Sequence, residues 1–76
     1  MSRDFVGLIQ SYYSKGVAEF SSSNYSVAFD IFIVCMSHIS LLLNNPRIPL
    51  DSYEMTKLIR LNALCLKFTE DCKCLM

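Results

Sequence analysis

Thiols and a single imidazole are the side chains in this 76-residue chain that could ligate a metal or act as nucleophiles. The four cysteines are Cys35, Cys65, Cys72 and Cys74, and the only histidine, His38, follows Cys35 by three residues. On a helix this spacing places one thiol and one imidazole on the same face, but a tetrahedral zinc site needs about four ligands. The Cys-Lys-Cys segment near the C-terminus lacks the second pair of a zinc knuckle. The sequence therefore predicts no metal and no cofactor, with the cysteines as small core residues.

Carboxylates paired with a histidine could provide general acid and base catalysis, but their spacing here is unfavourable. Asp30 and His38 are eight residues apart, which on a helix separates them by roughly two turns. Glu70 and Asp71 are adjacent, so on a helix their side chains point about 100° apart. Both glycines stand alone inside a helical pattern, so no glycine-rich phosphate-binding loop is present. We predict that the chain is not an enzyme.

Charge and composition point to a protein partner instead. Seven Lys and Arg balance seven Asp and Glu, and only 18% of the residues are charged while 53% are hydrophobic. Nucleic-acid-binding proteins usually carry a clustered basic surface, and binding to anionic lipid needs a similar excess of positive charge. We therefore expect that the chain does not bind nucleic acid and is not attracted electrostatically to anionic membranes. A neutral, apolar surface also favours self-association.

The longest apolar run covers residues 31–43, IFIVCMSHISLLL, and is thirteen residues long. A membrane-spanning helix needs about 20 apolar residues, and this run already contains two serines and a histidine. The N-terminal segment has no apolar stretch typical of a signal peptide. The sequence therefore predicts no membrane insertion, reduced thiols and a cytoplasmic protein.

The elements that would position these residues are helices. Apolar residues at steps of three and four predict helices over about 3–21, 25–44 and 52–75. A serine-rich turn at 21–24 and a loop with two prolines at 44–49 separate them. The predicted fold is an all-α, antiparallel up-down-up three-helix bundle that forms a single domain over residues 1–76.

Short polar side chains before each predicted helix are candidate N-caps. Ser2 or Asp4 could cap the first helix, and Ser23 or Asn24 the second. Asp51 is followed three residues later by a glutamate, which is the spacing of a capping box.

The second and third predicted helices are apolar over most of their circumference, as expected of helices with two neighbours. The second has one stripe of Ala28, Phe32, Cys35, Ile39 and Leu42, and an adjoining stripe of Phe29, Ile33, Met36 and Leu43. The third has one face with Met55, Leu58, Ile59, Cys65 and Leu66, and a second face with Leu61, Leu64, Phe68 and Leu75.

Gly16 lies inside the first predicted helix, where glycine costs about 1 kcal/mol relative to alanine. We interpret it as a packing glycine that permits another helix to approach closely. Small residues of the second helix, Ala28 or Cys35, are the expected neighbours.

The first fifty residues resemble a tetratricopeptide-type helix pair. That repeat places a large residue, a glycine, an alanine, an aromatic and a small residue at fixed spacings. The corresponding residues are Tyr12, Gly16, Ala28, Phe32 and Cys35. The match is partial, because Lys15 and Glu19 replace the leucine and the aromatic that usually flank the glycine.

The chain over nearly its whole length also resembles the MIT (microtubule-interacting and trafficking) domain, a family of three-helix domains with a long third helix. Residues 24–32 match its polar turn and its Tyr-x-x-Ala-x-x-x-aromatic segment. Residues 66–73 match the Leu, Glu and Lys of its Leu-x-Arg-Ala-Glu-x-x-Lys pattern, with Phe68 and Thr69 replacing Arg and Ala. Because a tetratricopeptide array needs several repeats and three helices are predicted here, we favour the MIT resemblance.

The MIT resemblance implies a peptide-binding adaptor for the C-terminal tails of ESCRT-III subunits, recruited to endosomal membranes. Such tails lie as a helix between helices 2 and 3, or as an extended strand between helices 1 and 3. Carried onto this chain, the resemblance implies a groove with Leu61, Leu64 and Phe68 on its floor, Ile33, Met36 and Ser40 on the facing helix, and Glu70 or Asp71 as acceptors of a basic ligand residue.

Two alternatives compete with this interpretation. The three apolar residues of the third helix could belong to the bundle core, and the two carboxylates could simply be solvated. The whole chain could instead be a structural helical segment, either the start of a tetratricopeptide-type array or a homodimerisation unit.

Overall fold

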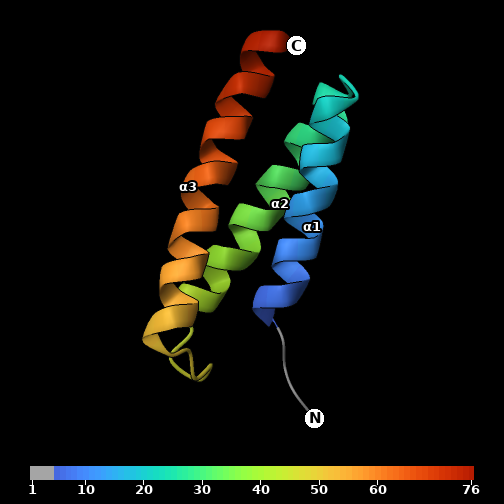
Figure 1. The fold of residues 1–76 in the computed structure, drawn as a ribbon. Coiled ribbons are helices and arrows are strands. Elements are labelled where there is room, and N and C mark those ends of the chain that lie inside the picture. The colour runs from blue at the N-terminus through green and yellow to red at the C-terminus, as the bar shows by residue number, and fades with distance from the viewer. Residues whose placement is uncertain (1–4) are drawn as a thin grey trace.

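The computed structural model describes residues 5–76, which form three α-helices and no strand. The helices are α1 (Phe5–Ser21), α2 (Tyr25–Asn44) and α3 (Ser52–Leu75), and consecutive helices run antiparallel (Figure 1). α2 packs against both α1 and α3, which contact each other less extensively. The predicted all-α, up-down-up bundle is confirmed. Positions 3 and 4 of the first predicted helix, and its proposed caps Ser2 and Asp4, lie outside the described residues.

The turn between α1 and α2 is built by backbone hydrogen bonds. Ser23 adopts a left-handed conformation with φ of 65°. The Ser23 N–H donates to the Phe20 carbonyl at 3.0 Å, and the Asn24 N–H donates to the Glu19 carbonyl at 2.9 Å. This pair of bonds is a Schellman motif, which satisfies carbonyls left free at the end of a helix.

Asn24 occupies the N-cap position of α2, but its side chain makes no capping hydrogen bond. Its amide Nδ2 instead donates to Glu19 Oε2 at 2.7 Å. The prediction that Asn24 or Ser23 caps α2 through its side chain is therefore wrong. The physical reason is that the Asn24 side chain is held by the carboxylate of the preceding helix.

The start of α3 carries the predicted capping box. Asp51 Oδ1 accepts a hydrogen bond from the Glu54 N–H at 2.7 Å. Glu54 Oε1 accepts one from the Asp51 N–H at 3.3 Å. These reciprocal bonds satisfy two backbone donors at the point where the proline-containing loop ends and α3 begins.

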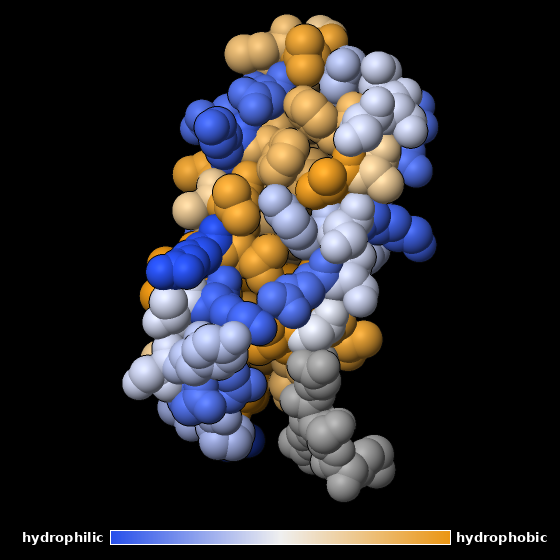
Figure 2. Space-filling model, in the orientation of Figure 1, coloured by the Kyte–Doolittle hydropathy of each residue, from blue (hydrophilic) through white to orange (hydrophobic). Residues whose placement is uncertain are grey.

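The core consists of two neighbouring clusters. The first, nearer the α2–α3 loop, contains Val6, Ile9, Ile39, Leu42, Leu58 and Leu61. The second, nearer the C-terminus of α3, contains Ala28, Ile31, Phe32, Cys35, Cys65 and Cys72. The rings of Tyr13, Phe20, Tyr25 and Phe68 pack against the second cluster. Apolar side chains reach the surface along the seam between α1 and α3 (Figure 2).

The predicted core stripe of α2 is confirmed, since all five of its residues are buried, and Ile31 is buried as well. The two apolar faces predicted for α3 are not the faces that the structure uses. The buried stripe takes residues from both of them and adds two more: Leu58, Leu61, Cys65, Thr69 and Cys72. A single stripe at steps of three and four faces α1 and α2, so most of the flanking apolar residues remain exposed, whereas Phe68 packs against rings of both neighbouring helices.

Gly16 lies at a close contact between α1 and α2, as predicted, but its neighbours differ from the prediction. A Cβ atom at this position would lie 2.8 Å from Phe32 Cε1 and 3.0 Å from Ile31 Cγ2. The expected neighbours, Ala28 and Cys35, are not the nearest ones. The absent side chain makes room for a large ring instead of pairing with a small residue.

The full length of α2 also bears on the membrane prediction. Although the apolar run is short, the whole helix has 20 residues, and an 18-residue stretch of it has a mean hydropathy of 2.0, enough to cross a membrane by length and composition. Of that stretch, 33% is buried inside the protein. The central helix of a bundle has the same character, so one such helix is weak evidence for a membrane span.

Candidate functional site

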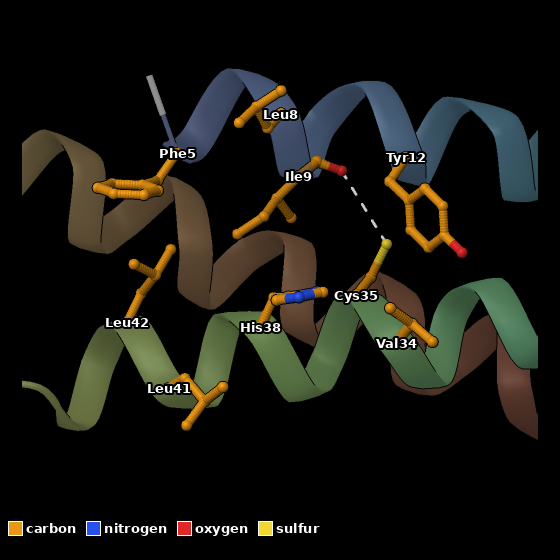
Figure 3. Close-up of a pocket in the computed structure, with 9 residues that line it drawn as sticks. All are labelled: Phe5, Leu8, Ile9, Tyr12, Val34, Cys35, His38, Leu41 and Leu42. Carbon is orange, nitrogen blue, oxygen red and sulfur yellow. Dashed lines mark hydrogen bonds between the residues drawn. The ribbon is translucent and has the colours of Figure 1, made fainter. Parts of the chain in front are cut away.

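A groove of about 670 Å³ lies between α1 and α2. Nine residues from these two helices line it: Phe5, Leu8, Ile9, Tyr12, Val34, Cys35, His38, Leu41 and Leu42 (Figure 3). No residue of α3 contributes to this lining. The groove therefore lies on the side of the α1–α2 pair that α3 does not line.

The groove has a buried floor and exposed rims. Ile9, Cys35 and Leu42 are buried and form the floor. Leu8 on the α1 rim is 70% exposed, and Leu41 on the α2 rim is 67% exposed. When a partner covers apolar side chains that are this exposed, the complex is stabilised by about 25 cal/mol per Å² of apolar surface buried.

Polar groups in the groove are few. The lining contains no Lys, Arg, Asp or Glu, and its polar side-chain atoms are the Tyr12 hydroxyl, the His38 imidazole and the Cys35 thiol. Cys35 Sγ points across the groove floor to the Ile9 carbonyl oxygen at 4.0 Å (Figure 3). Two polar groups at the rims of an apolar surface can orient a ligand, while the apolar area supplies affinity.

Helical spacing explains why these residues meet. Phe5, Leu8 and Tyr12 lie at steps of three and four on α1, and Val34, His38 and Leu41 follow the same pattern on α2. Each set is a stripe on one side of its helix. Because the two helices are antiparallel and adjacent, the two stripes face each other across the groove.

The buried cysteines are not equipped for nucleophilic chemistry. Burial raises the pKa of Cys35. Burial, with the neighbouring Cys35 thiol, raises the pKa of Cys65 from the ordinary 9.0 to about 12. Burial, with Asp71 as a smaller cause, raises the pKa of Cys72. A reactive cysteine needs the thiolate form near neutral pH, which these environments disfavour.

No three His, Cys, Asp or Glu side chains within residues 5–76 converge as metal ligands would. All four cysteines are free thiols, and Cys74 is the exposed one.

The structure distributes the residues of the predicted α2–α3 groove over several environments. Leu61 belongs to the buried core cluster next to Leu58. Phe68 stacks on Phe32 at 4.8 Å between ring centroids and also meets rings of α1, so it faces the interior. Leu64 is exposed.

The other predicted site residues lie on other faces. Ile33 is partly exposed on α2, and Met36 is half-buried against the second core cluster. Glu70 and Asp71 are exposed near the C-terminal end of α3. Phe68, turned into the aromatic cluster, and Leu61, enclosed in the core, offer little surface to a ligand.

The α1–α2 groove was not foreseen from the sequence, although its signal was present. α2 is apolar on more of its circumference than α1 and α3 can cover together. Val34 and Leu41, seven residues apart, continue a stripe that was not assigned to either predicted face. The pattern showed excess apolar surface but not which helix pair it would border.

A second, polar hollow of about 450 Å³ lies at the start of α3. It is lined by Ser52, Tyr53, Thr56, Lys57 and Arg60. The Lys57 ammonium lies 4.9 Å from the centre of the Tyr53 ring, and the Thr56 hydroxyl donates to the Ser52 carbonyl at 2.8 Å. Three of the five lining side chains, those of Tyr53, Thr56 and Lys57, are thus engaged within α3 itself.

Comparisons with protein-family models, with curated proteins and with solved structures gave no match for this chain. The candidate site therefore rests on its own geometry.

Proposed function

We propose that this chain is a non-catalytic protein-binding module that receives an amphipathic helix in the groove between α1 and α2. The observation that carries the proposal is the pairing of an apolar, uncharged groove with two highly exposed rim leucines, Leu8 and Leu41.

The architecture of the bundle supports a helical ligand. Two adjacent antiparallel helices form a groove on each of their two sides, and ridges-into-grooves packing lets a third helix lie in such a groove. α3 packs against this helix pair without lining the groove. α3 therefore leaves the groove open.

The chemistry of the groove defines that helix. Its contact face needs apolar side chains at steps of three, four and seven, as in other helix-in-groove complexes. The absence of charged lining residues means that a charged contact face would be desolvated without compensation. Tyr12 and His38 could each exchange one hydrogen bond with a polar residue at the edge of that face.

The MIT resemblance supplies the first peptides to test, the C-terminal tails of ESCRT-III subunits, and with them a role at endosomal membranes. In that family the tails use the seams between helices 2 and 3 or between helices 1 and 3. The α1–α2 groove is a different seam, so a tail bound there would dock in its own way.

The test is a titration of the isotopically labelled chain with ESCRT-III tail peptides, followed by NMR. Binding in the groove would shift the signals of Leu8, Tyr12, Val34 and Leu41. Leu41→Asp places a charge on the rim and should weaken binding at least about tenfold, the equivalent of 1.4 kcal/mol. Leu75→Asp is the matched control, because Leu75 is also an exposed leucine but lies at the far end of α3.

Saturable shifts confined to the groove and lost in Leu41→Asp would support the proposal. Equal affinity of Leu41→Asp and the unchanged chain would overturn it. Shifts around Ile33 and Leu64 would do the same and would favour the seam that the resemblance implies.

A further inference from the structure

An exposed apolar stripe on α3 has no partner within the described chain. It consists of Met55, Ile59 and Leu66, which are 44%, 59% and 51% exposed. These residues are separated by four and seven positions, so they lie along one side of the helix. None of them lines the α1–α2 groove, and none belongs to a core cluster.

The stripe is an apolar helical surface, as a ligand of the groove should be, and it is long enough to cover the groove. Leu66 lies eleven positions after Met55, which corresponds to about 16 Å along a helix. The groove runs beside residues 5–12 of α1 and 34–42 of α2, about 10–12 Å. A stripe of this length can cover the whole groove.

Charge does not oppose contact between the two surfaces. The groove lining has no charged residue, and the stripe consists of Met, Ile and Leu with the neutral Asn62 between them. The chain as a whole has a formal net charge of zero, so two copies have no net repulsion at long range. A partner of the same composition meets no electrostatic penalty.

We infer that the groove between α1 and α2 binds the Met55–Ile59–Leu66 stripe of a second copy of this chain, so that the molecules associate head to tail. The inference rests on the proposed function, because it names the helix that the groove receives. Groove and stripe are different surfaces on one molecule, so the contact is heterologous. In the resulting dimer one copy keeps a free stripe and the other keeps a free groove, so association continues beyond the dimer.

The test is analytical ultracentrifugation of the unchanged chain and three variants over the micromolar range. Ile59→Asp places a charge within the apolar stripe, and Leu41→Asp places a charge on the rim of the groove. Leu75→Asp is the control. All three positions are exposed, so the fold should be retained, and circular dichroism checks this. The unchanged chain and Leu75→Asp should grow in mass with concentration past the dimer, whereas Ile59→Asp and Leu41→Asp should each be monomeric.

Mixing the two disabled variants gives the decisive result. Ile59→Asp keeps an intact groove and Leu41→Asp keeps an intact stripe, so an equimolar mixture should form a dimer that stops at two chains. A groove-to-groove dimer would instead persist in Ile59→Asp and gain nothing from mixing. That outcome, or a mixture that stays monomeric, would overturn the inference.

The proposed function and this inference fail separately. An unchanged chain that is monomeric at every concentration overturns head-to-tail association. If that monomer still binds a tail peptide in a manner sensitive to Leu41→Asp, the protein-binding function stands. Self-association that is insensitive to Leu41→Asp overturns the inference whatever the peptide titration shows.

Discussion

The rings of Phe32 on α2 and Phe68 on α3 stack with their centroids 4.8 Å apart and their planes within 11° of parallel. Phe68 also meets Tyr13 and Phe20 of α1 edge-on, at 6.1 Å and 5.1 Å. One side chain of α3 thus contacts both other helices. The aromatic cluster joins the three helices at the end of the bundle where α1 and α2 are connected.

Replacing Phe68 should therefore damage the fold. Phe68→Ala should lower the free energy of unfolding by about 3 kcal/mol, at the low end of the range for a buried aromatic residue, because Phe68 is only partly buried. Leu64→Ala, four residues earlier on an exposed side of the same helix, should change it by less than about 1 kcal/mol. Urea denaturation followed by circular dichroism measures both.

The same pair distinguishes core from binding site. If Phe68→Ala left stability unchanged and removed binding of a tail peptide, the ring would belong to a ligand groove and the α2–α3 seam of the resemblance would be favoured.

The ends of all three helices and the starts of α2 and α3 could be predicted from the sequence, because local signals determine them. The apolar period, the two prolines and the Asp51–Glu54 capping box each act within a few residues. The core stripe of α2 was equally accessible, since its five residues follow the helical period and that helix faces both neighbours.

The faces of α3 could not be predicted in the same way. Residues on both sides of its buried stripe are apolar, so hydropathy alone could not select the stripe. Thr69 shows the limit well, because it is only 3% exposed although it is polar. Its hydroxyl donates to the Leu66 carbonyl at 2.7 Å within α3, which satisfies the buried group without any partner visible in the pattern.

The close contact at Gly16 predicts a cost for adding a single methyl group. Alanine is favoured over glycine in a helix by about 1 kcal/mol, but its Cβ would lie 2.8 Å from Phe32 Cε1. Phe32 is fully buried and held by the stack with Phe68, so its ring cannot move away freely. Gly16→Ala should lower the free energy of unfolding by about 1–2 kcal/mol, since overpacking outweighs helix propensity.

Thermal unfolding of Gly16→Ala checks this. Ala18→Gly, at an exposed position of the same helix, is a control that should lose about 1 kcal/mol from propensity alone. A Gly16→Ala chain more stable than the unchanged one would show that the two helices can separate slightly without loss.

At Ser23, in contrast to Gly16, a substitution should increase the stability of the chain. Its φ of 65° lies in the left-handed region, where a residue with a Cβ atom is strained and glycine is not. Ser23→Gly should raise the free energy of unfolding by about 0.5–1 kcal/mol, because glycine is the preferred residue at this position of a Schellman motif. Ser22→Gly is the matched control at a position without positive φ and should not stabilise. Equal effects of the two substitutions would contradict the role assigned to the turn.

The buried thiols predict how stability depends on pH in the alkaline range. In the unfolded chain Cys65 ionises near its ordinary pKa of 9.0, whereas in the folded chain burial keeps it protonated up to a pKa of about 12. The folded state therefore binds the proton more tightly above pH 9, and unfolding becomes more favourable as the pH rises. The contribution is fully present below pH 9, and one such thiol accounts for a loss of up to about 1.4 kcal/mol per pH unit above it.

Denaturation at several pH values from 8 to about 10.5 measures this slope. Cys65→Ala should have a shallower slope than the unchanged chain, while Cys74→Ala, which alters the exposed thiol, should not change it. Alkylation gives an independent readout: the folded chain should take up one label, at Cys74, and the three buried cysteines should react only when the chain unfolds. Rapid labelling of Cys65 in the folded chain would show that the α2–α3 interface opens to solvent, and the predicted pH dependence would then disappear with it.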